Sequence, residues 1–236
     1  MLAGIFLAGC DAHRPPQTVS VPTLPPPTVQ PAPTPVPPAA PAPAQPEITV
    51  APDAKVLYTE TGWASWYGPH YNKRRAANGE VFDMDSMTAA HLTIPLNSIA
   101  RVTNVKTGDS VILRITDRGP FAANRVIDLS KAAAQKVGVY RPGTALVKIE
   151  VLESPAPIDG AGRWCVQIGG FKNAGDASEL KEKLSRRYTT ARVLQFTSPI
   201  GEEWLRIRVA QDDKKRAENV IQETQTEAGM YLVRLD

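Results

Sequence analysis

Residues 98–117 read SIARVTNVKTGDSVILRITD, and this stretch decides the fold of the region around it. Apolar and polar residues alternate over Ser98–Asn104 and again over Ser110–Asp117, which is the two-residue period of a strand with one buried face. The residues Lys106-Thr107-Gly108-Asp109 between the two runs are typical of a hairpin turn. The stretch therefore predicts two neighbouring antiparallel strands, the second of which ends at Asp117.

The same β pattern extends over residues 57–153. Further short strands are expected at Gly62–Gly68, Val126–Leu129 and Leu146–Leu152. Ser130 is expected to cap a helix over Lys131–Val137 that stops at Gly138. About six short strands with one or two brief helices predict a small, mainly β barrel.

A second folded region is predicted over residues 162–236, after a hinge at 154–161. Its expected elements are a strand Trp164–Gly169, a helix Ala174–Tyr188, strands Ala191–Phe196 and Glu203–Val209, a helix Asp213–Glu227 and a strand Met230–Leu235. In the first helix, Ala177, Leu180 and Leu184 have the spacing of a buried stripe. The order βαββαβ predicts an α+β, ferredoxin-like domain with both helices on one face of the sheet.

Residues 11–56 have a composition that does not form a packed core. Fifteen of the 22 prolines of the chain lie in this segment, which has few charged residues. Proline removes backbone hydrogen-bond donors, and no helical or alternating pattern is present. We expect a disordered linker with polyproline II character.

Leu7-Ala8-Gly9-Cys10 ends a short apolar run at the start of the chain. The run is too short to span a bilayer, which takes about 20 residues, but it is similar to the end of a secretion signal over residues 1–10. The tetrapeptide matches a lipobox, in which the cysteine becomes lipidated; the alternative is a free cysteine in a frayed N-terminus. No Lys or Arg precedes the run, so we expect the true start to lie upstream. Cys165 would then be an unpaired thiol in a strand, and no disulfide is expected.

The charge balance argues against a nucleic-acid partner. The net charge is +3, and neither folded region has the cationic excess of a dedicated nucleic-acid binder. The βαββαβ order also occurs in RNA-binding domains, but the aromatic stacking strand of those domains is missing. The three histidines, His13, His70 and His91, lack the spacing of metal ligands, so neither a metal nor a cofactor is expected.

Six short motifs between residues 64 and 130 carry the clearest functional signal. They are Ala64-Ser65-Trp66-Tyr67-Gly68, Ala77-Asn78-Gly79-Glu80, Thr88-Ala89-Ala90-His91, Arg101-Val102-Thr103-Asn104, Asp117-Arg118-Gly119-Pro120-Phe121 and Ile127-Asp128-Leu129-Ser130. In this order, they resemble the signature of the rare lipoprotein A family. The resemblance implies a double-psi β-barrel, similar to that of expansins. It also implies lytic transglycosylation of peptidoglycan, with a preference for glycan strands stripped of stem peptides, although some members lack measurable activity.

The resemblance puts catalytic weight on Glu80, His91, Asp117 and Asp128. Cutting a glycosidic bond requires an acid that protonates the leaving oxygen, and one carboxyl can act first as the acid and then as the base. Asp117 is the best candidate because it ends a strand before a turn, and Glu80 is a candidate neighbour that would raise the pKa of Asp117.

Each of these residues has a structural alternative. Asp117 could cap the amides of a tight turn, and Glu80 could be a solvated hairpin residue. His91 could be a buried histidine that bonds a loop, and Asp128 could be an ordinary residue at the start of a helix.

Substrate binding in the barrel is expected to involve Trp66, Tyr67, Asn78 and Arg118. Aromatic rings pack on the apolar faces of sugars, although Trp66 could equally belong to the core. The run Lys73-Arg74-Arg75 could attract muramic acid carboxylates or be a solvated loop. The sequence departs from the family pattern at Asn72, Lys73 and Ala76, which puts affinity or activity in doubt.

Trp164-Cys165-Val166-Gln167-Ile168-Gly169-Gly170-Phe171 resembles the first strand of the sporulation-related repeat (SPOR) domain, a module that binds peptide-free glycan. Strand alternation directs Val166 and Ile168 toward the helices and therefore Gln167 toward the open face of the sheet. By the same alternation, Trp204, Arg206 and Arg208 are expected to join Gln167 in a glycan-binding strip, unless they are only solvated residues of an open sheet.

The leading hypothesis is a lytic transglycosylase that acts at the division septum. The alternatives are a non-catalytic glycan binder and a scaffold for division proteins. The expected partners are peptide-free peptidoglycan strands, a membrane reached through lipid on Cys10, and division-machinery proteins. We expect a periplasmic location and favour the outer membrane, although Asp11 resembles an inner-membrane retention signal.

Overall fold

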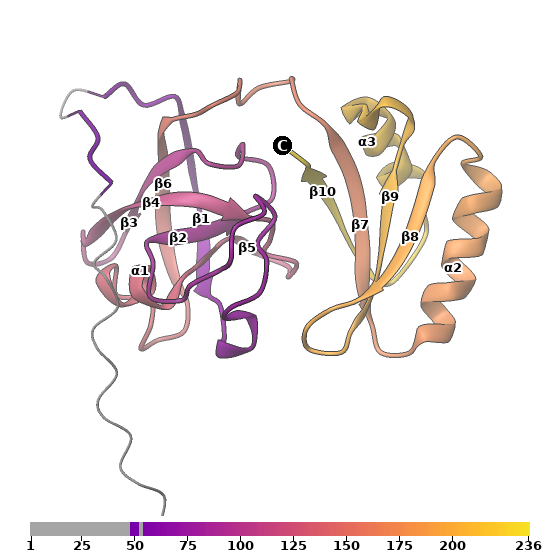
Figure 1. Cartoon of the computed structure of the whole chain (residues 1–236), viewed down its shortest axis with the longest axis horizontal. Helices are drawn as coiled ribbons and strands as arrows, with labels where there is room; N and C mark the ends of the chain where they lie inside the picture. The colour runs from indigo at the N-terminus through magenta and orange to yellow at the C-terminus, as the bar shows by residue number, and fades with distance from the viewer. Residues whose placement is uncertain (1–47, 52–53) are drawn as a thin grey trace, which may run out of the picture. The chain divides into compact units, whose positions relative to one another are not determined.

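The structure is a computed structural model that describes residues 48–51 and 54–236. The predictions of a signal with a lipidated Cys10 and of most of the proline-rich linker lie outside the described residues. The described chain forms a β-barrel followed by an α+β domain (Figure 1). None of the helices in this part of the chain has the length and apolar character needed to cross a bilayer.

The barrel consists of six strands that close in the order β1-β5-β2-β4-β3-β6. Its elements are β1 (Tyr58–Trp66), the short helix η1 (Pro69–Tyr71), β2 (Thr88–His91), β3 (Ile99–Asn104), β4 (Ser110–Asp117), β5 (Arg125–Leu129), α1 (Lys131–Lys136) and β6 (Ala145–Glu153). Two pairs, β1 with β5 and β2 with β4, are parallel, and the others are antiparallel. The expected double-psi β-barrel is confirmed.

Alternation in the sequence produces the barrel core as predicted. In β3 every second side chain is buried, and Ala100 and Val102 point inward. Leu113 and Ile115 of β4 and Ile149 of β6 are also fully buried. Burying such side chains stabilises the fold by roughly 1.5–3 kcal/mol each. Ser130 caps α1 by accepting a hydrogen bond from the amide of Ala133, as its position predicted.

Strand β2 was not predicted, because its sequence lacks the two-residue alternation. Ala89, Ala90 and His91 are all buried, since β2 lies between β4 and β5 inside the closed barrel. A short strand buried on both faces has no polar face that would reveal it in the sequence.

The C-terminal domain has a four-stranded antiparallel sheet in the order β10-β7-β9-β8. Its elements are β7 (Trp164–Phe171), α2 (Ala174–Arg187), β8 (Arg192–Thr197), β9 (Glu203–Arg208), η2 (Ala210–Asp212), α3 (Lys214–Glu223) and β10 (Gly229–Arg234). Buried residues from both helices and from the sheet form one core, including Ala177, Leu184 and Val220. The predicted βαββαβ order is confirmed.

Helix α3 is shorter than predicted. It begins after Asp213, whose side chain accepts a hydrogen bond from the amide of Arg216, and it ends at Glu223 rather than at Glu227. Thr224 has an extended backbone, with φ −90° and ψ 123°. The polar residues 224–227 have no buried side chain that would stabilise another helical turn.

Candidate functional site

The candidate site is assembled around the short strand β2. Ala90 pairs with Asp117 of β4 on one side and with Asp128 of β5 on the other. Neighbouring strands lie about 4.8 Å apart, so the two aspartates flank one alanine across three adjacent strands. Ala90 is fully buried, and a Cβ placed on Gly119 would lie 3.6 Å from the Cβ of Ala90. Small residues thus allow the ends of the two aspartate-bearing strands to approach each other.

Asp117 occupies the end of β4, as the sequence predicted. Its carboxylate accepts hydrogen bonds from the amide of Arg118 at 2.8 Å and from the amide of Ala77 at 3.0 Å. Burial raises the pKa of Asp117 above its ordinary value of 3.8, although both amides oppose the shift. The result is a carboxyl that is held in a fixed position and that keeps its proton more readily than an exposed aspartate does.

Asp128 has a similar environment. It accepts a 2.6 Å hydrogen bond from the hydroxyl of Ser65, and the guanidinium of Arg125 lies 3.4 Å away. Burial raises the pKa of Asp128, and the Ser65 bond and the Arg125 charge oppose this shift. Asp128 is therefore a constrained, buried carboxyl rather than an ordinary helix-start residue, because Ser130 supplies the helix cap.

Tyr67 lies next to both carboxyls. Burial is the main cause that raises the pKa of the Tyr67 hydroxyl, and the charges of Asp117 and Asp128 add to it. The ring packs 5.6 Å from that of Tyr71 and 5.0 Å from that of Phe82. Tyr67 is half-buried and its hydroxyl is buried, so it forms a wall of the site rather than an exposed sugar platform.

Trp66 is half-buried against the barrel core. Its ring lies 4.8 Å from that of Tyr140 and packs against the barrel core. The core alternative considered for Trp66 therefore describes its position better than the substrate platform does.

Glu80 does not raise the pKa of Asp117, contrary to the expectation from the sequence. Its two carboxylate oxygens each accept a 2.7 Å hydrogen bond from the guanidinium of Arg114. This bonding is the main cause that lowers the pKa of Glu80, and burial rather than Glu80 raises the pKa of Asp117. The expectation is wrong because the Glu80 carboxylate is paired with the guanidinium of Arg114, which neutralises its charge.

Residues 77–80 nevertheless connect Glu80 to Asp117. The Asn78 side chain donates to Asn97 and accepts from the amide of Glu80, both at 3.0 Å, so Asn78 stabilises the turn itself. The same turn presents the Ala77 amide to Asp117. A small cavity of about 50 Å³ beside the turn is lined by Glu80 and by Asp83. The sequence reasoning did not single out Asp83, since no strand or motif boundary marks it.

Both ring nitrogens of His91 are occupied by protein groups. Nδ1 accepts hydrogen bonds from the amides of Thr93 and Ile94, at 3.2 and 3.0 Å. Nε2 therefore carries the proton and lies 2.9 Å from the carboxylate of Glu60. The geometry favours the structural alternative for His91, in which the ring stabilises the loop after β2.

Arg118 also has a structural set of contacts. Its guanidinium donates to the carbonyl of His91 at 2.9 Å and of Ile94 at 2.6 Å, and it donates to the carbonyl of Asp236 as well. Burial lowers the pKa of Arg118 to about 10. These bonds stabilise the loop after β2. Arg118 contacts Asp117 through its backbone amide and not through its guanidinium.

The four residues expected to form the glycan-binding strip share the predicted face of the C-terminal sheet. Gln167 pairs with Arg206 across β7 and β9, and Arg206 donates to the Gln167 side chain at 3.3 Å. Gln167 and Trp204 are only 3% and 5% exposed, so the expectation of an open strip is wrong for these two. The indole of Trp204 lies against Gly169, where an added Cβ would be 2.1 Å from it, and its ring centroid is 5.3 Å from that of Phe121.

The site can therefore supply a proton from a fixed carboxyl. A carboxyl with a raised pKa donates a proton near neutral pH more readily than an exposed one, and a second buried carboxyl lies on the other side of Ala90. Most glycosidases use two carboxyl groups that flank the glycosidic bond to be cleaved.

Comparison with protein families covers both folded regions. Residues 59–149 match the family model described as lytic transglycolase. Residues 160–234 match the model of the SPOR domain.

Several relatives share the name endolytic peptidoglycan transglycosylase RlpA. The protein of Neisseria meningitidis serogroup A is 58% identical over 93 residues, which are 39% of this chain and 39% of that protein. The Vibrio cholerae protein is 52% identical over 100 residues, which cover 42% and 38%. The Campylobacter jejuni protein is 36% identical over 163 residues, which cover 59% and 58%. The chain thus spans about two fifths of the length of the first two relatives.

Proposed function

We propose that this chain, a member of the RlpA family with a lytic transglycolase barrel and a SPOR domain, cuts peptidoglycan glycan strands to leave 1,6-anhydro ends. The observation that carries the proposal is the placement of two carboxyls, the half-buried Asp117 and the buried Asp128, on either side of Ala90.

In the proposed reaction, Asp117 acts twice on one sugar linkage. Its protonated carboxyl first gives the proton to the oxygen that joins N-acetylmuramic acid to the next N-acetylglucosamine. The bond between this oxygen and C1 of the muramic acid then breaks. The C6 hydroxyl of the muramic acid then attacks C1 of the same ring, and its proton passes to the Asp117 carboxylate. The new C6–O–C1 bond gives a 1,6-anhydro end, and Asp117 returns to its protonated form.

The neighbours of Asp117 make these two steps possible. Burial keeps the proton available, while the Ala77 and Arg118 amides orient the carboxyl and stabilise it after the proton has left. Asp128, fixed by Ser65 and Arg125, is the second carboxyl and would stabilise positive charge that develops on the sugar ring.

The test is the release of 1,6-anhydro ends from purified peptide-free glycan strands, followed by mass spectrometry. We expect release by the unaltered chain and a loss of at least about 100-fold in the Asp117→Asn variant. Asp85→Asn is the matched control, because it makes the same chemical change at an exposed carboxylate. Binding without release by the unaltered chain would favour the non-catalytic glycan binder, and no binding would favour the scaffold.

The proposal extends to a lipid anchor on Cys10, a periplasmic location with preference for the outer membrane, enrichment at the division septum and contacts with division proteins. Membrane fractionation of the unaltered chain and of a Cys10→Ser variant tests the anchor. We expect Cys10→Ser to leave the membrane fraction. An unchanged distribution between membrane and soluble fractions would contradict the proposed anchor.

A further inference from the structure

The two carboxyls of the proposed site belong to a row of residues that crosses four strands of the barrel. Ser65 of β1 pairs with Asp128 of β5. Asp128 pairs in turn with Ala90 of β2, which pairs with Asp117 of β4. Neighbouring strands are about 4.8 Å apart, so the row is on the order of 14 Å long. A glycan strand that lies along the carboxyls in the direction of this row therefore reaches β1.

Strand β1 directs alternate side chains to the two faces of the barrel wall. Tyr58, Ala64 and Trp66 lie in the barrel core or pack against it. The odd-numbered residues between them therefore point outward, and these include Trp63 and Ser65. Trp63 precedes Ser65 by two residues, which is about 7 Å along the strand, and it is 49% exposed. An exposed aromatic side chain thus lies on the outer face of β1, near the end of the carboxyl row.

Two more exposed apolar side chains continue the surface beside Trp63. Trp63 pairs with Leu146 of β6, and the amide of Val105 donates a 3.0 Å hydrogen bond to the carbonyl of Leu146. All three side chains are exposed. They form an apolar strip over β1, β6 and the end of β3.

Arg125 connects the apolar strip to the carboxyls. It is the β5 partner of Trp63, and its guanidinium lies 3.4 Å from the carboxylate of Asp128. The strip therefore adjoins the proposed site and does not belong to a separate face of the barrel.

The indole of Trp63 has no partner among the described residues. The other three tryptophans each pack against another aromatic ring or a cation. Within residues 48–51 and 54–236, the Trp63 ring makes no such contact, and its Nε1 makes no hydrogen bond. An indole combines an apolar ring face with one N–H donor, so it can pack on the apolar face of a sugar ring and donate to a sugar oxygen.

We propose that Trp63 is a sugar-stacking platform of the barrel, on which an N-acetylhexosamine ring of the bound glycan strand packs, with Leu146 extending the apolar contact. The inference rests on the proposed function, because the carboxyl row sets the course of the strand. Three side chains are far fewer than the roughly 20–30 residues that each partner contributes to a stable protein interface, so a glycan is the better occupant.

The position of the platform determines which kinetic constant it affects. The ring on Trp63 lies beyond Asp128 and takes no part in the bond that breaks. Its contact is therefore equally strong in the ground state and in the transition state. Such a contact lowers KM and leaves kcat unchanged.

Kinetics of 1,6-anhydro release from peptide-free strands test the platform. Trp63→Ala should raise KM by about tenfold and change kcat by less than about twofold. Trp63→Phe keeps an aromatic ring, so its KM should stay within about threefold of that of the unaltered chain. Leu57→Ala is the matched control, because Leu57 is an apolar residue with a similar exposure of 51% and precedes the other end of β1.

Hydroxyl-radical footprinting locates the contact without requiring catalysis. The whole chain with Asp117→Asn, which should leave the strands uncut, is oxidised with and without peptide-free strands. Mass spectrometry then measures the oxidation of each side chain, so glycan bound elsewhere on the chain does not contribute to the signal at Trp63. We expect the strands to protect Trp63 and to leave the oxidation of Leu57 unchanged.

An unchanged KM in Trp63→Ala, a fall in kcat alone, or an unprotected Trp63 would overturn the proposal. A dimer of the unaltered chain that Trp63→Ala dissociates would assign the strip to a second copy and overturn it as well. If release occurs while Trp63 stays unprotected, the platform is wrong and the proposed enzyme stands. If nothing is released but Trp63 is protected, the enzyme is wrong and the platform stands.

Discussion

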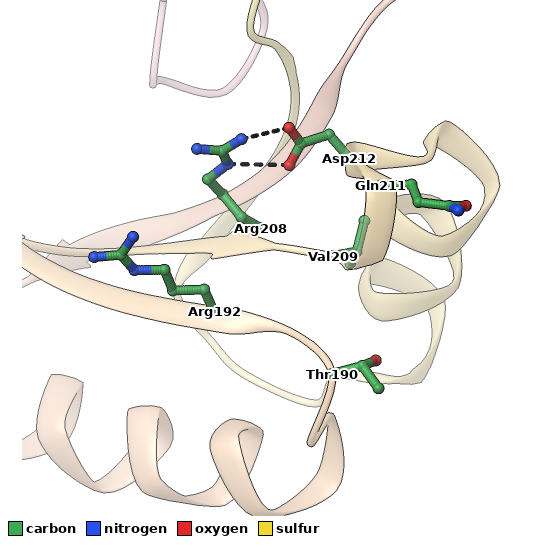
Figure 2. A pocket seen from close by; sticks show the side chains of 6 residues that line it. All are labelled: Thr190, Arg192, Arg208, Val209, Gln211 and Asp212. Carbon is green, nitrogen blue, oxygen red and sulfur yellow. Dashed lines mark hydrogen bonds and ion pairs between the residues drawn. The ribbon is translucent and has the colours of Figure 1, made fainter.

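In the barrel, Asp117 is a half-buried carboxyl fixed by backbone amides and Asp128 is a buried carboxyl fixed by a serine, whereas in the C-terminal domain Arg192 is an exposed cation without a protein partner in the described chain. Burial changes the protonation of a group, and exposure leaves a group free to meet a ligand. The barrel carboxyls therefore fit the proton transfer proposed above, whereas Arg192 is constrained by no hydrogen bond or ion pair among the described residues (Figure 2). Substitutions in the two regions should differ accordingly.

The largest effect is expected from Ala90→Leu, which enlarges the fully buried side chain between the two aspartates. Overpacking at this position should lower the free energy of unfolding by about 1–3 kcal/mol and displace the carboxyls. Urea unfolding and the release assay measure the two consequences. Ala123→Leu, at an exposed position, is the control; similar losses in both variants would argue against a special role of Ala90.

The next effect is the pH dependence of stability in Asp128→Asn. Burial raises the pKa of Asp128 above 3.8, so the folded chain holds this proton more tightly than the unfolded chain does. The contribution of the carboxyl to stability is therefore fully present below its ordinary pKa and is lost as the pH rises through the raised value. The variant should gain stability relative to the unaltered chain between about pH 3 and about pH 7 in urea unfolding. A difference that is constant over this range would contradict a raised pKa of the buried Asp128.

Glu80→Gln should have a smaller effect, because Glu80 is half-exposed and paired with Arg114. We expect the free energy of unfolding to fall by less than about 1 kcal/mol. Release of 1,6-anhydro ends should fall by less than about tenfold, since the turn that presents the Ala77 amide is loosened but Asp117 remains. A loss as large as that of Asp117→Asn would show that Glu80 takes part in the chemistry directly.

The smallest effect on stability is expected for Arg192→Gln. The side chain is exposed and directly opposite Arg208, so its removal eliminates a repulsion and no attractive contact. The free energy of unfolding, measured by urea unfolding, should stay within about 0.5 kcal/mol of that of the unaltered chain. Substantial destabilisation would mean that Arg192 makes a stabilising contact in the folded sheet.

The features that could be predicted from the sequence depend on local patterns. Alternation predicted β3 and β4, the turn residues predicted their hairpin, and Ser130 marked the start of α1. Asp117 was a candidate because it ends a strand before a turn. Strand β2 was missed because burial on both faces removes the alternation.

The organisation of the site depends on contacts between distant residues. Asp117 and Asp128 become neighbours only through Ala90, and the partner of Glu80 is an arginine 34 residues further along the chain. Arg118 stands in a turn whose sequence suggested a ligand contact, yet its guanidinium binds carbonyls after β2. No local pattern specifies such partners, because barrel closure determines them.

The closed order of the barrel strands has a consequence for when activity can arise. The first and last strands, β1 and β6, pair with each other, and β2 inserts between β4 and β5 only in the closed ring. A chain that is still extended has ordinary aspartates at positions 117 and 128, each in water and far from the other. The proposed capacity to cut would then appear only together with the finished tertiary structure.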